Sequence, residues 1–371
     1  MASKLKQYKK VAIVHDILYE FGGAEIVLLE LLKLFPDAQL YTFFYNNNNE
    51  AIKKMFPQQI NSSFFSRIPF IFLLGKYISI LKLVSWIYFL FLDFKKYDLV
   101  ISSSHSYNSK IVQTNTTTKH ISYIHTPPRY LYFLSNELDF LHYPIVKFLL
   151  APFFYCMRKI DLFAANQPDI LIANSKEVQQ RIHRIYKRNS FLIYPPVSYP
   201  KKVVKKTSKF FIAHSRLVKQ KGIELLVRTC TIFNFPLVVI GSGYQENFLR
   251  SIAGKTVFFT GFLPKEQVVS LYKHAKALLY AAKEEDFGII PVEAQALGVP
   301  VVAYNSGAIQ ETVQEAVSGV LYSRYTVWSL RNAMITLKSL KISPNSCRKN
   351  AVQFKSDNFR KKFKKIVYET I

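Results

Sequence analysis

Short apolar runs alternate with longer stretches of helical periodicity along most of this chain. The first run, residues 11–14, is followed by a loop with Gly22 and Gly23 and then by five apolar positions between 27 and 35. Apolar side chains three and four residues apart form one face of a helix, so residues 24–35 are predicted to be an amphipathic helix. A strand, a glycine-bearing loop and a helix together predict the first unit of a parallel sheet, whose ligands bind beyond the carboxyl ends of the strands.

The same alternation continues to the end of the chain and predicts an α/β protein with parallel sheets. Further strands are expected at residues 39–44, 98–102, 120–124, 170–173, 191–194, 210–213, 237–240, 257–260, 277–280 and 301–304. A helix capped by Ser175 follows the strand at 170–173, and its basic residues, Arg181 among them, are expected to form a solvated face. A final helix, residues 357–368, carries Phe359 and Phe363 on one apolar face.

The length and one polar stretch predict two domains. A chain of 371 residues is long enough for two domains with separate cores. Pro195 and Pro196, followed by a lysine-rich stretch, mark the expected boundary. We therefore expect a first domain at 1–196, a linker at 197–208, a second domain at 209–355, and a C-terminal helix at 356–371.

Two aromatic-rich stretches interrupt the regular alternation. Residues 68–92 contain uncharged blocks separated by Lys76 and Lys82, and the longest block has ten residues. A spanning helix needs about 20 apolar residues, so a transmembrane segment is not predicted. Two alternatives remain for 68–92: helices lying in a membrane interface, or helices of the first domain's core. Residues 148–157 form a similar uncharged block with Pro152 inside, for which core packing is expected.

The net charge of the chain limits the kinds of binding partner to expect, and its cysteines and first residues bear on its cellular location. The chain has 50 Lys and Arg against 24 Asp and Glu, a formal net charge of +26. This balance favours anionic partners: nucleic acid, an anionic membrane surface, or phosphorylated substrates. Three widely separated cysteines indicate neither a disulfide framework nor a zinc site. The start of the sequence lacks the apolar region of a secretion signal, so a cytoplasmic location is expected.

The segment between residues 280 and 302 is the strongest candidate for an active site. Glu285 and Glu293 are separated by seven residues around a turn at Gly288, and Glu293 falls within a predicted helix. The backbone N–H groups of Gly288 and Ile289 at that helix start suit an anionic ligand such as a phosphate. Each carboxylate accepts hydrogen bonds from two hydroxyls, so the segment suits a nucleotide sugar. From spacing alone, a solvated acidic turn before an ordinary helix remains an equal alternative.

Other polar residues follow predicted strands. His125 comes directly after the strand at 120–124, although a lone histidine is more often structural than catalytic. Arg216 and Lys221, five residues apart at a strand-to-helix turn, have the chemistry to clamp a diphosphate. Gly241 and Gly243 form a tight turn that is expected to line a nucleotide pocket. Ser104 lies in a polar loop that is expected on the acceptor side.

The wording EEDFGIIPVEAQALGVPVVAY resembles the Glu-x7-Glu signature of the family 4 glycosyltransferases, which are retaining enzymes of the GT-B fold. The resemblance extends over essentially the whole chain, through the unit at 11–34, the segment HTPPRY that starts at His125, and the segment RLVKQKG that starts at Arg216. It implies two Rossmann-like domains facing a cleft, with the C-terminal helix crossing back to the first domain.

The resemblance also implies a role for each matched residue. His125 lies near the reacting face of the sugar and Glu285 contacts the sugar, so both are the expected catalytic residues. Glu293 contacts the ribose. The remaining expected site residues are, for the donor diphosphate, Arg216, Lys221, Gly22, Gly23, Gly288 and Ile289; for the nucleotide, Gly241 and Gly243; and for the acceptor side, His15, Asp16, Ser104 and Arg129.

The resemblance further implies a hexosyltransferase of bacterial envelope-polysaccharide synthesis. The wording is most similar to mannosyltransferases, so GDP-mannose is the first expected donor and a UDP-hexose the second, with a lipid-linked oligosaccharide or polysaccharide as acceptor. No Asp-x-Asp motif is present, so neither a metal nor another cofactor is expected. A lipid-linked acceptor would place the protein on the inner face of the cell membrane.

Two other classes of function compete with this interpretation. A GT-B sugar-nucleotide epimerase would share the fold but would turn over the sugar nucleotide without any acceptor. A nucleic-acid-binding protein would use the same positive charge. The chain shows no recognition module for nucleic acid of a known kind, so no nucleic-acid partner is expected.

Overall fold

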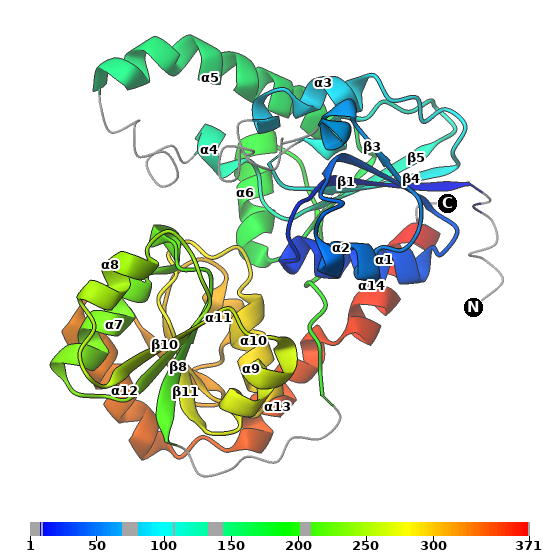
Figure 1. Ribbon diagram of the computed structural model, residues 1–371. Helices are drawn as coiled ribbons and strands as arrows, with labels where there is room; N and C mark the ends of the chain where they lie inside the picture. Colours follow the sequence, from blue (N-terminus) through cyan, green and yellow to red (C-terminus); the bar gives the residue numbers. More distant parts are fainter. Residues whose placement is uncertain are drawn as a thin grey trace. The chain divides into compact units, whose positions relative to one another are not determined.

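The computed structural model describes residues 8, 10–68, 81–106, 108–132, 144–200 and 209–369. The chain divides into two compact units. Unit 1 comprises Met1–Pro196 with Phe359–Ile371, and unit 2 comprises Val197–Asn358. Each unit is a parallel sheet covered by helices on both faces, as the alternating pattern predicts (Figure 1).

Unit 1 is built around a parallel sheet in the order β3-β2-β1-β4-β5-β6-β7. Its elements in chain order are β1 (Val11–Leu18), α1 (Gly23–Leu34), β2 (Gln39–Tyr45), α2 (Glu50–Met55), β3 (Ile60–Ser62), the 3-10 turn η2 (Phe64–Arg67), α3 (Ser85–Leu90), β4 (Leu99–Ser104), the 3-10 turn η4 (Ser109–Ile111), β5 (Lys119–Ile124), α4 (Arg129–Tyr132), α5 (Pro144–Ala165), β6 (Ile170–Ala173), α6 (Lys176–Tyr186), β7 (Phe191–Leu192) and α14 (Ser356–Glu369). The order 3-2-1-4-5-6 is that of a Rossmann-like sheet, in which the strand order reverses between β1 and β4.

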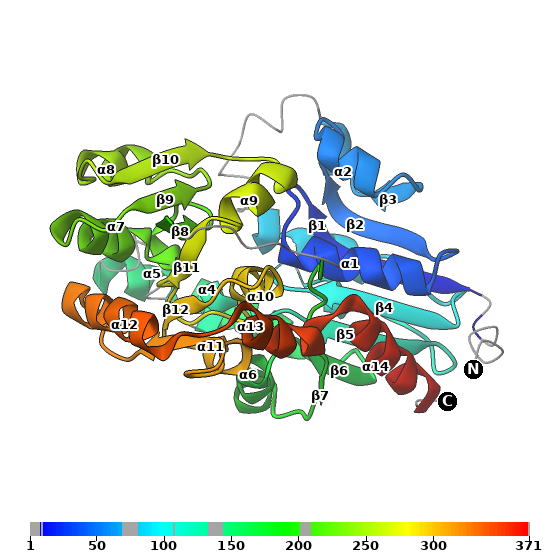
Figure 2. The same cartoon turned by 90° about the horizontal axis from the view of Figure 1, so that it is seen from below.

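The alternation of side chains along β1 separates two apolar layers. Val11 and Ile13 pack against α1, α2 and α14, whereas Ala12 and Val14 pack against α3 and α5 on the opposite face. Figure 2 shows α1 and α14 in front of the sheet strands of this unit. The apolar face predicted for the last helix is confirmed, because Phe359, Phe363, Ile366 and Val367 are buried in the layer with α1.

Two strands of unit 1 are longer than the sequence predicts. β1 was expected to end at Val14, and β4 at Ser102, but pairing with β2 continues to Leu18 and pairing with β5 continues to Ser104. His15 and Asp16 therefore lie inside β1, and Ser104 ends β4 rather than lying in a loop. Polar side chains misled the boundary prediction, since these residues are buried between neighbouring strands.

Unit 2 repeats the same topology with a sheet in the order β10-β9-β8-β11-β12-β13. Its elements are β8 (Phe210–His214), the 3-10 turn η7 (Lys219–Lys221), α7 (Ile223–Ile232), β9 (Leu237–Ile240), α8 (Glu246–Ser251), β10 (Val257–Gly261), α9 (Lys265–Tyr272), β11 (Ala275–Tyr280), α10 (Ile289–Ala296), β12 (Val301–Tyr304), α11 (Ile309–Thr312), β13 (Gly319–Tyr322), α12 (Val327–Leu340), α13 (Pro344–Ala351) and the 3-10 turn η8 (Val352–Phe354). Figure 1 shows α7 and α12 on one side of this sheet and α9 and α10 on the other.

Two expectations about burial differ from the structure. Core packing of residues 148–157, which fall in α5, holds only in part: Phe154 and Met157 are buried, but Phe148 and Leu149 are 79% and 68% exposed. Arg181, expected on a solvated face of α6, is 4% exposed, and its guanidinium donates to Glu177 and Thr126. Helical periodicity alone does not tell which face of a helix meets the sheet.

Part of the segment at 68–92 lies outside the described residues, namely 69–80. The described part forms α3, whose Phe89 is buried in unit 1. Residues 201–208 of the expected linker also lie outside the described residues, while Val197 hydrogen-bonds Phe354 in unit 2 at 2.8 Å. In the described ranges, no helix is both long enough and apolar enough to cross a bilayer.

Candidate active site

Two histidines of unit 1 are joined by one serine at the carboxyl ends of its central strands. Parallel pairing places His15 of β1 directly opposite Ser103 of β4, and His125 follows the end of β5. The Ser103 hydroxyl lies 3.1 Å from His15 Nδ1 and 2.9 Å from His125 Nε2. All three residues are buried. The strand order therefore assembles this cluster where Rossmann-like sheets bind ligands.

The cluster extends to the glycine loop before α1. His15 Nε2 lies 3.4 Å from Glu25 Oε1, and the other carboxylate oxygen of Glu25 accepts from the Gly22 backbone N–H at 2.8 Å. Gly23 starts α1. The sequence pattern contained a signal for this contact, because a glutamate three residues after a helix cap commonly reaches back to the cap N–H. Glu25 was not predicted as a site residue.

His125 is held neutral by its surroundings. Burial lowers the pKa of His125 well below its ordinary value, and the nearby His15 and His105 lower it further. A neutral imidazole carries one donor and one acceptor nitrogen. Because Nε2 is engaged with Ser103, Nδ1 is the nitrogen left to contact a ligand.

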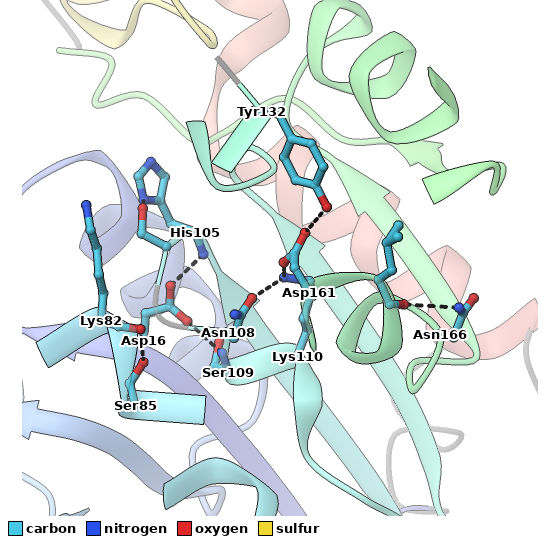
Figure 3. Close-up of polar contacts among 12 residues, drawn as sticks. Asp16, Lys82, Ser85, His105, Asn108, Ser109, Lys110, Tyr132, Asp161 and Asn166 are labelled. Atoms are coloured by element: carbon cyan, nitrogen blue, oxygen red, sulfur yellow. Dashed lines mark hydrogen bonds and ion pairs between the residues drawn. The ribbon is translucent and has the colours of Figure 1, made fainter. Parts of the chain in front are cut away.

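Asp16 has a structural role that the sequence did not indicate. Its two carboxylate oxygens accept from the backbone N–H groups of His105 and Ser109, at 2.7 and 2.9 Å, and so hold the loop after β4 (Figure 3). The same loop contains Lys110, whose ammonium lies 2.6 Å from Asp161 of α5. Tyr132 donates to the second oxygen of Asp161 at 2.8 Å. These contacts connect the loop after β4 to β1 through Asp16 and to α5 through Asp161.

The other two residues predicted on the acceptor side lie at element ends. The Ser104 hydroxyl is buried at the end of β4 and finds no hydrogen-bond partner among the described residues. Arg129 is partly buried and begins α4. Thr126, the residue after His125, accepts from Arg181 at 3.3 Å. Arg181 thus supports the segment after β5, a role that sequence reasoning missed.

In unit 2, Glu285 is bound by a lysine and a tyrosine. It follows β11, and its Oε2 lies 2.8 Å from Lys221 Nζ and accepts from the Tyr280 hydroxyl at 2.7 Å. Burial and the charge of Glu285 raise the pKa of Tyr280 well above its ordinary value, so the phenol keeps its proton and donates. The structure therefore brings Lys221 and Glu285 together at the end of the central strands of unit 2.

Backbone contacts hold this acidic segment in place. Ala308 N–H donates to the Glu285 carbonyl at 2.9 Å. Gly307 has φ of +60°, and a Cβ added there would lie 2.3 Å from the Glu285 carbonyl oxygen. Gly288 caps α10 with φ of +88°, so it has the left-handed conformation that favours glycine, and Ile289 is the first residue of that helix. The turn predicted at Gly288 is confirmed.

Glu293 and Arg216 are charged groups of unit 2 for which the described residues supply no hydrogen-bond partner. Glu293 lies in α10, is partly buried, and receives no hydrogen bond from any described residue. Burial raises the pKa of Glu293, and Lys265 opposes this effect. Arg216 follows β8 and is exposed, also without a partner in the described parts of the chain.

Gly241 and Gly243 allow two loops to approach closely. A Cβ at Gly241 would lie 2.0 Å from the Ser215 carbonyl oxygen, and one at Gly243 would lie 2.4 Å from the Leu217 carbonyl oxygen. The two glycines therefore position the loop that carries Arg216. Among the described residues, no group of three or more His, Cys, Asp or Glu is placed to hold a metal ion.

A comparison with known families decides the class of unit 2. Residues 198–354 match the family described as "Glycosyl transferases group 1". Unit 2 contains a group 1 glycosyltransferase domain. This domain includes Arg216, Lys221, Glu285 and Glu293.

Relatives and solved structures agree with that family. The chain is 25% identical over 227 residues to the α-1,3/1,6-mannosyltransferase ALG2 of Saccharomyces cerevisiae, covering 46% of this chain and 45% of ALG2. It is 32% identical over 146 residues to a GDP-mannose-dependent monoacylated α-(1-6)-phosphatidylinositol monomannoside mannosyltransferase of Corynebacterium glutamicum, covering 35% and 38% of the two chains. The alignments with the first curated relatives span about a third to a half of those proteins.

The whole chain has the GT-B fold. HepE of Anabaena, solved in complex with UDP-glucose, superposes with a TM-score of 0.70 over 97% of this chain and 99% of HepE, at 18% identity. The two Rossmann-like units and this likeness confirm the predicted fold class. The group 1 domain and the mannosyltransferase relatives confirm the resemblance to a glycosyltransferase of the family 4 type.

Proposed function

We propose that this protein transfers a hexose from a nucleotide sugar to a lipid-linked oligosaccharide or polysaccharide acceptor, with retention of the anomeric configuration. The observation that carries the proposal is the arrangement in unit 2. A lysine–glutamate pair, Lys221 with Glu285, lies beside the turn at Gly288, and α10 beyond it carries Glu293, whose carboxylate has no hydrogen-bond partner among the described residues. A diphosphate, a sugar and a ribose have complementary groups for these residues.

Each charged residue of unit 2 has a role in donor binding under this proposal. Lys221 and the exposed Arg216 bind the diphosphate and stabilise the charge that develops on it as the sugar leaves. Backbone N–H groups at Gly288 and Ile289 add donors to the same phosphates. Glu285 accepts hydrogen bonds from sugar hydroxyls, and Glu293 accepts from the ribose hydroxyls.

The chemical step needs no enzymic nucleophile. The bond between the anomeric carbon and the diphosphate oxygen breaks, a bond from the acceptor oxygen forms on the same face of the sugar, and the acceptor proton passes to the leaving diphosphate. We propose that neutral His125 orients the sugar near the anomeric carbon through Nδ1, and that the reaction requires no metal. Ser104 and Arg129 belong to the acceptor side in unit 1. Glu25 contacts His15, which is connected to His125 through the Ser103 hydroxyl.

GDP-mannose is the proposed donor, with a UDP-hexose as the second candidate. The support for mannose is that two relatives, ALG2 and the corynebacterial enzyme, are mannosyltransferases. The support for a UDP-hexose is the binding of UDP-glucose by HepE. The net charge of +26 fits an acceptor at an anionic membrane surface, so we place the protein peripherally on the inner face of the cell membrane.

Product analysis tests the proposal. Purified protein is incubated with GDP-mannose or a UDP-hexose and with a lipid extract of envelope membranes, and the lipids are analysed by mass spectrometry. A mass increase of one hexose, absent in Glu285→Gln, supports transfer. Conversion of the sugar nucleotide to an isomer without a glycoside product would instead indicate a GT-B epimerase.

A further inference from the structure

The outward face of α5 is apolar. Ile145, Phe148 and Leu149 are 74%, 79% and 68% exposed, and Tyr155 and Phe163 further along the helix are also exposed. A helix on the surface of a soluble domain normally directs polar side chains outward. In α5, these solvent-exposed side chains are aliphatic and aromatic, as is typical of a buried core.

The exposed residues form one continuous stripe. Positions 145, 148, 149, 152, 156 and 163 follow the three- and four-residue spacing of a single helix face. The opposite face is buried, since Phe154, Met157 and Ala164 pack into unit 1. The inner face of α5 is buried against the rest of unit 1. The outer stripe is therefore a separate apolar surface that remains exposed after unit 1 has folded.

A neighbouring helix adds to this surface. Leu83, just before α3, and Trp86 of α3 pack against the cluster that contains Phe154 of α5. Phe91, directly after α3, is 81% exposed, and Ile87 on the same face of α3 is 42% exposed. The two helices, which share apolar clusters on their inner sides, thus both present exposed aromatic and aliphatic side chains. An exposed apolar surface of this kind marks an interaction site.

The charges along α5 favour an anionic partner. Lys159 is exposed within the stripe and lies over the ring of Tyr155 at 5.4 Å. The sole acidic residue of the helix, Asp161, is fully buried and paired with Lys110, so no carboxylate of α5 faces solvent. Aromatic side chains beside a lysine, with no exposed acid, are typical of helices that lie in the headgroup region of an anionic bilayer.

We propose that the outer stripe of α5, together with the exposed apolar residues of α3, is a membrane-docking surface that lies in the interface of an anionic lipid bilayer. The helix would lie parallel to the membrane with Phe148 and Leu149 among the acyl chains and Lys159 at the phosphates. The docking surface is argued from α5 and α3 alone. Only its biological role rests on the proposed function, because docking would bring unit 1 to a lipid-linked acceptor.

Vesicle sedimentation tests this surface. Wild type, the double variant Phe148→Asp/Leu149→Asp, and Lys159→Glu are mixed with phosphatidylcholine vesicles with and without about a third phosphatidylglycerol. Phe258→Asp, an aspartate in place of a 60% exposed phenylalanine of β10, is the matched control. Circular dichroism and thermal melting confirm that every variant folds.

We expect wild type and Phe258→Asp to sediment with the anionic vesicles, the double variant to lose at least about tenfold in apparent affinity, and Lys159→Glu to lose severalfold. Equal sedimentation of wild type and the double variant would overturn the proposal. So would a lack of vesicle binding by wild type together with a dimer that the double variant disrupts, because a second copy would then cover the stripe.

Nucleotide binding on the same preparations separates the two proposals. A double variant that no longer binds vesicles but is stabilised by GDP or UDP as wild type is would support the docking surface alone. Vesicle binding without any nucleotide binding would leave the docking surface intact and remove the proposed transferase function. Failure of vesicle binding with normal nucleotide binding would remove only the docking surface.

Discussion

The Ser103 hydroxyl lies 2.9 Å from Nε2 of His125, and the same hydroxyl reaches His15 at 3.1 Å. One side chain on β4 therefore fixes the orientation of a histidine that follows β5. Loss of this hydroxyl in Ser103→Ala is expected to lower kcat about tenfold while KM for the donor changes less than about threefold, because His125 loses its orientation and not its contact groups. Steady-state kinetics measure both constants.

The same position offers a rescue test. Ser103→Thr keeps the hydroxyl and is expected to recover most of kcat. Ser122→Ala on the adjacent strand β5 removes another buried hydroxyl, one without a partner among the described residues, and should leave kcat unchanged. Equal losses in Ser103→Ala, Ser103→Thr and Ser122→Ala would mean that packing, and not the hydrogen bond to His125, matters there.

Gly307 is required for the position of Glu285. In Gly307→Ala the new Cβ would meet the Glu285 carbonyl oxygen at 2.3 Å and its nitrogen at 2.7 Å, in addition to the unfavourable φ of +60°. We expect a loss of about 1–3 kcal/mol in the free energy of unfolding and weaker nucleotide-sugar binding. Urea denaturation and calorimetry measure the two effects.

Gly261 provides the matched control for Gly307. Its φ is +70°, but a Cβ there would meet nothing within 4 Å. Gly261→Ala should therefore show the backbone cost without the loss of nucleotide-sugar binding. If both alanine variants bind the donor as wild type does, Glu285 is not held by this contact or does not bind the sugar.

Lys110 and Asp161 form an ion pair that is closed to water, with side chains 1% and 0% exposed. Removal of one partner leaves a buried charge, so Lys110→Met is expected to lower the free energy of unfolding by about 3–5 kcal/mol. The double variant Lys110→Met/Asp161→Leu should recover a large part of that loss. Urea denaturation of the single and double variants tests this coupling, and a purely additive cycle would contradict it.

His120 predicts a pH dependence of stability. Burial, with a smaller contribution from Arg188, lowers the pKa of His120 to about 3, whereas an unfolded chain has a histidine pKa of about 6.5. Below pH 6.5 the unfolded state binds a proton that the folded state does not, so stability falls by up to about 1.4 kcal/mol per pH unit toward pH 3. Burial lowers the pKa of His214 to about 4, which adds the same trend.

Denaturation at several pH values checks this prediction. Between pH 6.5 and pH 5, His120→Gln should lose about 2 kcal/mol less stability than wild type. The variant is expected to be less stable at neutral pH because it loses the contact of His120 Nε2 with Ser102. Parallel pH profiles of stability for the two proteins would contradict this account, because they would show that folding does not lower the pKa of His120.

The order of strands and helices was readable from the sequence because each parallel strand is a short apolar run followed by an amphipathic helix. The boundaries of β1 and β4 were not, because His15 and Ser103 are polar residues whose partners come from other strands. The outer stripe of α5 was hidden for a related reason. Apolar periodicity identified residues such as Phe148 but not the side of the helix that unit 1 covers.

The candidate residues of unit 2 were found by a local motif, and the structure adds how they contact one another. The spacing of Glu285 and Glu293 was visible, and their places before and inside α10 are confirmed. The pairing of Glu285 with Lys221 and Tyr280 was not visible, since it joins loops that are 64 residues apart in the case of Lys221. The contact of Arg181 with Thr126 could not be predicted, because the two residues are 55 positions apart and belong to no shared sequence motif.

The central claim is that unit 2 binds a nucleotide sugar through Glu293 and its neighbours. Thermal-shift titration of wild type and Glu293→Ala with GDP, UDP, GDP-mannose and UDP-hexoses tests it most directly, with Glu224→Ala, at a half-exposed glutamate of α7, as control. A ligand at about 100 times its Kd stabilises the folded state by about 3 kcal/mol. We predict stabilisation of wild type and Glu224→Ala by one nucleotide and its sugar, lost in Glu293→Ala. Melting temperatures unchanged by every nucleotide would contradict the account.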